Sequence, residues 1–107
     1  MPHIEIKYSK DLKLDCKLIF NRLESVINTF DSTSGVCKAR AYPCSIYSHT
    51  HVLVEVMIMK KSHRDQQFCE ELLEIIHHEL SKILTGKYYF SLSLWFSSEF
   101  YITKKVE

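Results

Sequence analysis

Apolar and polar residues along the chain follow two different periods, which divide it into extended and helical segments. From His3 to Tyr8 every second residue is apolar, a period that indicates a strand with one buried face. Ser9 and Asp11 then offer side chains that can cap the start of a helix. The apolar residues that follow have helical spacing and predict an amphipathic helix ending near Phe30: Leu12, Cys16, Ile19, Phe20, Leu23, Val26, Ile27 and Phe30.

A turn and a short strand are expected after this helix. Residues 31–35 are rich in turn-forming side chains and end at Gly35. A second strand is expected from Cys37 to Tyr42. Because Pro43 has no N–H to donate to a neighbouring strand, the strand either stops there or lies at a sheet edge.

The second half of the chain repeats this plan. A nearly continuous apolar run from Val52 to Met59, interrupted by Glu55, indicates a strand covered on both faces. A helix can start within residues 62–65 and stop at Gly86. Its apolar stripe consists of Phe68, Leu72, Ile75, Ile76, Leu80, Ile83 and Leu84. A last strand is expected from about Tyr88 to Phe96, with alternating faces.

The order strand, helix, strand therefore occurs twice, at about residues 3–43 and 52–97, and predicts one α/β (α+β) domain over residues 1–107. Each β-α-β unit is expected to be right-handed, so both helices should cover the same face of one four-stranded sheet. The strands nevertheless carry apolar side chains on both faces, because Tyr89 and Trp95 lie opposite Phe90 and Leu92. Something must cover the second face, and self-association is the simplest candidate.

Charge and composition exclude several classes of partner. The chain has 14 Lys and Arg residues against 13 Asp and Glu residues, a formal net charge of +1, so no electrostatic footprint for nucleic acid or an anionic membrane is present. Its longest apolar runs are far too short to span a bilayer. The opening residues alternate like a strand and lack the apolar core of a signal peptide, and the cysteines form no C-x-x-C pair. We therefore expect a cytoplasmic protein.

Histidine and cysteine spacing argues against a metal site. Neither His49 with His51 nor His77 with His78 has the i, i+4 spacing of a helical zinc site or a cysteine partner at finger spacing. Cys16 and Cys69 fall within predicted helices, where a free thiol usually packs as a small hydrophobic group. We expect no bound metal, and a nucleophilic cysteine stays open as an alternative.

Three stretches of the chain combine into the pattern of a known group. They are the opening Met-Pro-His-Ile, the segment Gly-Val-Cys-Lys-Ala-Arg at residues 35–40, and the helix Gln-Gln-Phe-Cys-Glu-Glu-Leu-Leu-Glu-Ile-Ile at residues 66–76. With the two β-α-β units, they resemble the 5-carboxymethyl-2-hydroxymuconate delta-isomerases of the tautomerase superfamily. The resemblance implies a homotrimer with a cofactor-independent active site near each N-terminal proline, lined partly by neighbouring subunits, and a small carboxylic acid as substrate.

The N-terminal proline can supply the base for such chemistry. Methionine is efficiently removed before a small residue, and its removal would make Pro2 a secondary amine. Burial and nearby cations disfavour the protonated amine and lower its pKa towards working pH. The neutral amine can then remove a proton from an acidic carbon or an enol and return it elsewhere on the same conjugated system.

Cationic side chains are needed to bind the carboxylates of the substrate. Lys38 and Arg40 are two residues apart on a strand and therefore share a face. Arg40 can bind a carboxylate with two parallel bonds, whereas Lys38 supplies a point charge, and either can stabilise a developing dienolate. Lys38 stands where the family pattern has arginine, which puts bidentate binding there in doubt. Arg64 is a possible further pocket residue, although the connector at residues 60–64 is shorter than in the family and lacks its glycine.

Three functions are compatible with the sequence. The first is a delta-isomerase of an unsaturated dicarboxylic acid, in the breakdown of aromatic compounds. The second is another proline-based tautomerase, such as one for keto-enol conversion of 2-oxo acids. The third is an oligomeric binding module of the same fold without activity.

Overall fold

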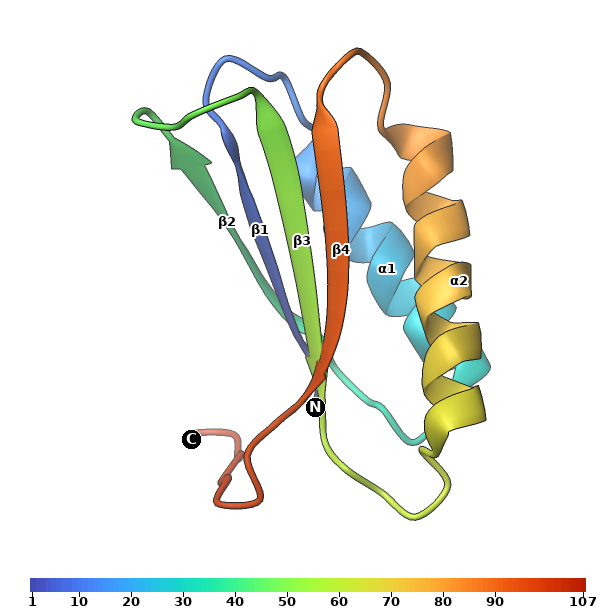
Figure 1. The fold of residues 1–107 in the computed structure, drawn as a ribbon. Helices are drawn as coiled ribbons and strands as arrows, with labels where there is room; N and C mark the ends of the chain where they lie inside the picture. Colours follow the sequence, from blue (N-terminus) through green and yellow to red (C-terminus); the bar gives the residue numbers. More distant parts are fainter.

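The computed structural model describes all 107 residues, which form a four-stranded sheet with two helices packed on one face (Figure 1). The elements in chain order are β1 (His3–Ser9), α1 (Cys16–Phe30), β2 (Lys38–Cys44), β3 (His51–Ile58), α2 (Gln66–Ile83) and β4 (Tyr89–Phe96). Neither helix is long and apolar enough to cross a membrane. The predicted repeat of strand, helix and strand is confirmed.

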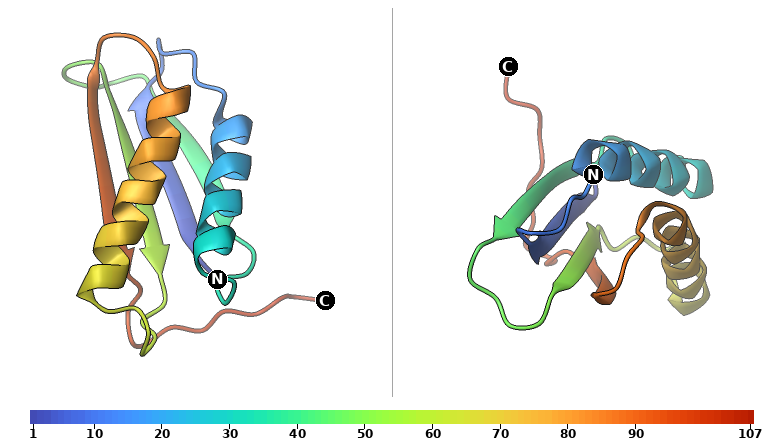
Figure 2. Two further views of the ribbon diagram at one scale, coloured as in Figure 1. Left: turned by 90° about the vertical axis from the view of Figure 1, so that its right-hand side faces the viewer. Right: turned by 90° about the horizontal axis from the view of Figure 1, so that it is seen from above.

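The sheet is mixed, because its two β-α-β units join through their first strands. The strand order is β2-β1-β3-β4; β1 is parallel to β2 and antiparallel to β3, and β3 is parallel to β4. Both crossover helices therefore lie on the same side, and Figure 2 shows them side by side and antiparallel against the sheet. The predicted fold class, a four-stranded α+β sheet with two helices on one face, is confirmed.

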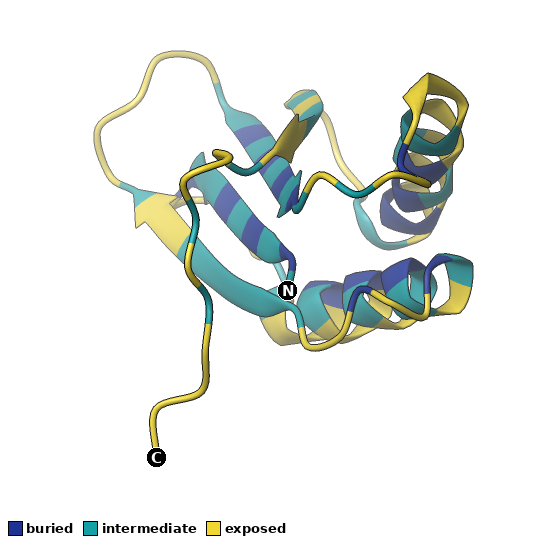
Figure 3. Cartoon of the chain, turned by 90° about the horizontal axis from the view of Figure 1, so that it is seen from below, coloured by how far each residue is buried: buried dark blue, intermediate teal, exposed yellow.

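The core lies between the sheet and the helices. Twelve apolar side chains are fully buried there: Ile4, Ile6, Val52, Val54, Val56 and Ile58 from the strands, and Ile19, Leu23, Ile27, Leu72, Ile76 and Leu80 from the helices. On β1 and β3 these buried residues alternate with more accessible ones (Figure 3), as a period of two requires. On the helices they recur every three or four residues, so each helix buries one stripe.

The start of α1 differs from the sequence prediction. The helix begins at Cys16 and not directly after Ser9 or Asp11, because Asp15 is the residue that caps it: its carboxylate accepts the Leu18 N–H at 3.1 Å. Ser9 ends β1, and its buried hydroxyl accepts the backbone N–H of His51 at 2.9 Å. The Ser9 side chain thus bonds across the sheet and is not available as a helix cap.

The sheet face opposite the helices is open in the single chain. β2 extends past Pro43 to Cys44 as an edge strand, one of the two outcomes that the proline allowed. β3 is covered by the helices on one face only; Leu53 and Met57 are half-buried on the other. Tyr42, Tyr89 and Trp95 are exposed. This open face, the side of the sheet away from the helices, therefore carries apolar side chains without a covering layer.

Candidate functional site

Pro2 lies at the end of the sheet where β1 and β2 begin and β3 ends (Figure 1). Its ring is buried, and its carbonyl accepts the backbone N–H of Lys38 at 2.9 Å. The α-amino group of Met1 lies 3.7 Å from the sulfur of Met59, just past the end of β3. The residue predicted to be the base is thus held by the first backbone hydrogen bond between the parallel strands β1 and β2.

Positive charge surrounds this end of the chain. The pKa of the Met1 α-amino group is lowered, first by burial and then by the charges of Lys38, Lys61 and Arg64. Cys37 is the neighbouring group whose ionised form would oppose them, but burial raises the pKa of its thiol to about 11. The thiol is therefore neutral near pH 7 and does not offset the charges of these cations.

Helix α1 holds the start of β2 in place beside Pro2. The amide side chain of Asn28 bonds both backbone groups of Gly35, accepting its N–H at 3.1 Å and donating to its carbonyl at 2.8 Å. Gly35 has a φ of +74°, a left-handed conformation that glycine adopts without strain. Glu24 then accepts the Cys37 N–H at 2.7 Å. These bonds from one helix fix where Lys38 enters the sheet.

Lys38 and Arg40 both lie on the open face, as their two-residue spacing predicts. Arg40 donates to Glu5 at 3.0 Å, to Nδ1 of His3 at 3.2 Å and to the Tyr42 hydroxyl at 3.1 Å. Lys38 instead bonds the C-terminal segment, residues 97–107, which passes this end of the sheet. The two cations are therefore held by different partners, Arg40 by neighbouring strand residues and Lys38 by a distant part of the chain.

The C-terminal segment contributes two residues that sequence reasoning missed. Lys38 donates to Thr103 at 2.8 Å and to the Tyr101 hydroxyl at 3.5 Å, and the same hydroxyl lies 3.0 Å from Nε2 of His3. Their signal in the sequence is the alternation of Phe100 and Ile102, which are exposed, with these two polar residues. That alternation indicates an extended segment with one polar side turned towards the sheet.

His3 belongs to the site as well, although packing or solvent contact was the expectation from its sequence position. Burial lowers the pKa of its imidazole, and the charges of Lys38 and Arg40 lower it further. His3 is therefore neutral near pH 7. It links the two cations, since one ring nitrogen contacts Arg40 and the other contacts Tyr101.

Arg64 lies behind the site, between the helices and the end of β3. Its guanidinium, only 2% exposed, donates to Asp31 at 2.9 Å, to the Met59 carbonyl at 2.6 Å and to Ser34 at 3.1 Å. Burial alone would raise the pKa of Asp31, but hydrogen bonds from Thr33, His63 and Arg64 hold it well below its usual range. The charge of Arg64 thus acts on the α-amino group of Met1, and Arg64 also holds Met59, whose sulfur lies beside that group. Direct contact between Arg64 and a substrate stays a prediction.

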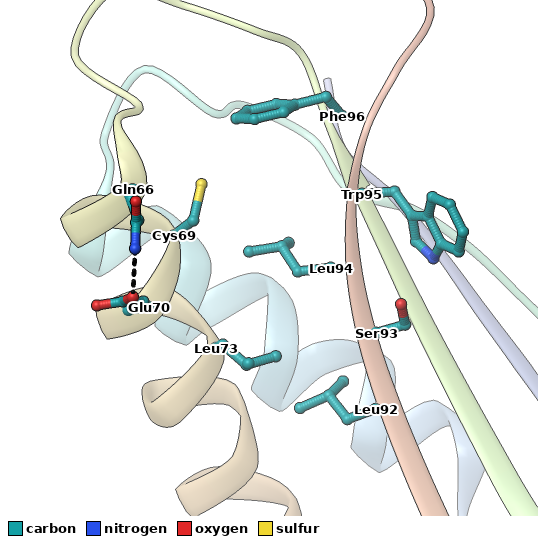
Figure 4. Close-up of a pocket in the computed structure, with 9 residues that line it drawn as sticks. All are labelled: Gln66, Cys69, Glu70, Leu73, Leu92, Ser93, Leu94, Trp95 and Phe96. Carbon is teal, nitrogen blue, oxygen red and sulfur yellow. Dashed lines mark hydrogen bonds between the residues drawn. The ribbon is translucent and has the colours of Figure 1, made fainter.

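Two of the hollows that border the sheet are relevant to the site. A shallow one of about 260 Å³ on the open face touches His3 and Glu5 and extends to Trp95. A groove of about 400 Å³ separates α2 from β4, with Leu73 and Cys69 facing Leu92, Leu94 and Phe96 (Figure 4). The groove contains none of the predicted site residues. Burial raises the pKa of the Cys69 thiol in it, which disfavours the reactive thiolate.

Comparison with known proteins identifies the fold. No protein-family profile and no curated protein matches the sequence. Among solved structures, a 5-carboxymethyl-2-hydroxymuconate delta-isomerase has a TM-score of 0.73 at 19% identity, over 99% of this chain and 89% of its own. A 5-carboxymethyl-2-hydroxymuconate isomerase from Deinococcus radiodurans R1 has a TM-score of 0.74 at 19% identity, over 99% and 90%.

A more distant structure shows how widely this fold extends. A macrophage migration inhibitory factor-like protein from Entamoeba histolytica has a TM-score of 0.58 at 12% identity, over 96% of this chain and 95% of its own. At these identities the likeness establishes the fold alone, which this chain shares with the three structures. The family resemblance seen in the sequence is confirmed at this level.

Proposed function

We propose that the protein is a cofactor-independent isomerase that moves a proton within an unsaturated carboxylic acid, with the amine of Pro2 as the base. The observation that carries this proposal is the partly buried α-amino group at this end of the chain, whose pKa is lowered first by burial and then by the charges of Lys38, Lys61 and Arg64. The same influences would act on the Pro2 amine once Met1 is removed. A base that is neutral near pH 7 is what a proton shift requires.

The proposed reaction is a 1,3-proton shift. The lone pair of the Pro2 nitrogen takes a proton from the enol oxygen or from an acidic carbon, which leaves a conjugated dienolate. The protonated amine then returns the proton to another carbon of the same system, so that the base is regenerated and no net oxidation occurs. Cationic donors on the open face stabilise the negative charge that the intermediate carries.

The substrate class follows from the charges beside Pro2. Lys38 and Arg40 share the open face at the base of the sheet and flank His3, which is neutral. Two cations on the same face of the sheet as His3, the residue after the proposed base, favour an acid with more than one anionic group, such as 5-carboxymethyl-2-hydroxymuconate. A 2-oxo acid with a single carboxylate fits the same base with fewer ionic contacts.

Self-association is part of the proposal. Tyr42, Tyr89 and Trp95 are exposed on the open face, where a second copy would cover them. The resemblance to trimeric isomerases favours three copies around a central axis. Light scattering coupled to size-exclusion chromatography should give a mass three times that of the chain, and a monomer at micromolar concentration would exclude an intersubunit site.

A proline substitution tests the base directly. The rates of parent and Pro2→Ala protein are compared on 5-carboxymethyl-2-hydroxymuconate, 2-hydroxymuconate and phenylenolpyruvate. We expect Pro2→Ala to lose about a hundredfold in kcat, the scale of a general base contribution. Pro43→Ala is the matched control, because Pro43 is the other proline of the chain and lies on the edge strand. Equal rates for parent and Pro2→Ala would show that the proline mechanism is wrong.

The state of the N-terminus is a separate requirement. Intact-mass spectrometry of the protein purified from its native cells should show loss of one methionine. A retained Met1 would leave the Pro2 nitrogen in a peptide bond and exclude it as the base. If Met1 is removed but no acid in the panel reacts, the non-catalytic binding module becomes the better interpretation.

A further inference from the structure

The Tyr101 hydroxyl contacts two residues of the candidate site, His3 and Lys38. It lies 3.0 Å from Nε2 of His3 and 3.5 Å from the ammonium group of Lys38, although Tyr101 is separated from His3 by 98 positions in the chain. Phe100 and Ile102 on either side of it are exposed. The segment therefore turns its polar residues towards the sheet and its apolar ones away.

Arg40 determines which nitrogen of His3 carries the proton. A guanidinium has donors and no acceptor, so Nδ1 of His3 must accept the bond from Arg40 at 3.2 Å. The neutral imidazole has only one N–H, which must then be on Nε2. Nε2 faces the Tyr101 oxygen, and His3 is consequently the donor in that bond.

The Tyr101 oxygen therefore accepts two hydrogen bonds. Lys38 also can only donate, so its contacts with Tyr101 and Thr103 both run from the ammonium group. Both lone pairs of the Tyr101 oxygen are then engaged. Its O–H, which needs a separate acceptor, donates to no other group of the chain. Lys38 likewise has three N–H donors and uses two of them.

Two free donors thus remain next to each other, one on a cation and one on a hydroxyl. We propose that the Tyr101 O–H and the third N–H of Lys38 together bind one carboxylate of the substrate. Resting on the proposed function for its substrate class, this inference adds Tyr101 to the site as a substrate-binding residue. The pair supplies the two donors that one arginine would present, which answers the doubt raised by the lysine at position 38.

The test measures binding separately from turnover. Adipate, a dicarboxylate that has no enol to isomerise, is titrated into parent protein, Tyr101→Phe, Thr103→Val and Tyr89→Phe by calorimetry. We expect Tyr101→Phe to weaken adipate binding about tenfold, since it removes one bond to a charged group. Tyr89 is an exposed tyrosine on the far edge strand, so Tyr89→Phe should bind adipate as the parent does.

Thr103→Val separates binding from simple attachment of the C-terminal segment. It removes the 2.8 Å bond from Lys38 but keeps the Tyr101 O–H, so it should weaken adipate binding less than Tyr101→Phe does. Equal losses in the two variants would mean that Tyr101 only anchors the segment, and the inference would be wrong. Parent-like binding by Tyr101→Phe, or no adipate binding by the parent, would overturn it as well.

Nitrogen NMR of the parent protein gives a check that needs no variant. The inference requires a neutral His3 with its proton on Nε2 and a shift of these signals when adipate is added. A proton on Nδ1 would contradict the direction of the hydrogen bonds. If the parent binds adipate through Tyr101 but isomerises no acid, the proposed function fails and the binding site remains.

Discussion

On β1, Ile4 and Ile6 point towards the helices, whereas His3, Glu5 and Lys7 point to the open face. The first pair is fully buried among aliphatic side chains of both helices and of β3. The second group is held by polar bonds to Arg40, Glu55 and Tyr101. The helix-covered side of β1 therefore contributes to the core, and its open side carries residues of the candidate site. Substitutions on the two sides should change the free energy of unfolding by different amounts.

The largest difference in unfolding free energy is expected between substitutions at two neighbouring positions of β1, Ile6 and Lys7. Ile6→Ala should lower the free energy of unfolding by about 3 kcal/mol, because the side chain is fully buried and its loss leaves a cavity. Lys7→Ala removes only the partly exposed ion pair with Glu55 and should unfold close to the parent. Urea unfolding followed by circular dichroism measures both. Similar losses would show that the open face also contributes to the core.

A smaller loss is expected for the buried ion pair behind the site. Asp31→Asn should lower the free energy of unfolding by about 2 kcal/mol, since Arg64 keeps its charge and loses a charged acceptor. Asp11→Asn is the control, because Asp11 bonds the hydroxyl of Tyr47 at the surface. If both variants have the same stability, Arg64 is not held by Asp31 in solution.

The same pair predicts how stability changes in acid. The pKa of Asp31 is lower in the folded chain than in the unfolded one, so the stability it contributes is present above about pH 4. That contribution is lost as the pH falls towards the folded pKa. The difference in unfolding free energy between parent and Asp31→Asn should thus be constant from pH 5 to 7 and shrink below pH 4. A difference that grows in acid would have the wrong sign.

The smallest effect on a single chain is expected on the open face. Trp95 is 55% exposed, so Trp95→Gln should change the unfolding free energy of a monomer by no more than about 0.5 kcal/mol. If other copies cover this face, the loss should be larger and should grow with protein concentration. Unfolding curves at two concentrations a hundredfold apart distinguish these outcomes.

The helix-covered side could be predicted from the sequence, because its signal is local and periodic. The spacing of Ile19, Leu23 and Ile27 and the alternation on β1 were sufficient to predict the layers. The predicted start of α1 is too early, since Asp11 and Asp15 are both good caps by residue type. Only tertiary structure separates them: Asp15 accepts the Leu18 N–H, whereas Asp11 accepts the hydroxyl of Tyr47.

The candidate site could be predicted only in part. Pro2, Lys38 and Arg40 were identified from a motif and from spacing along one strand. Tyr101, Thr103 and the partners of Arg64 were not, because each contact joins residues at least 30 positions apart, apart from the one to Met59. Such pairings depend on where the chain returns in space, and no period along the sequence records that.

The central position of β1 has a consequence for how the chain folds. The two β-α-β units look like separate modules, but β1 and β3 each have a strand of the other unit as a neighbour. Either unit alone would expose the edge of its first strand and one side of a shared core. The similarity of the two halves therefore does not make two folding units, and the chain should unfold in a single cooperative transition.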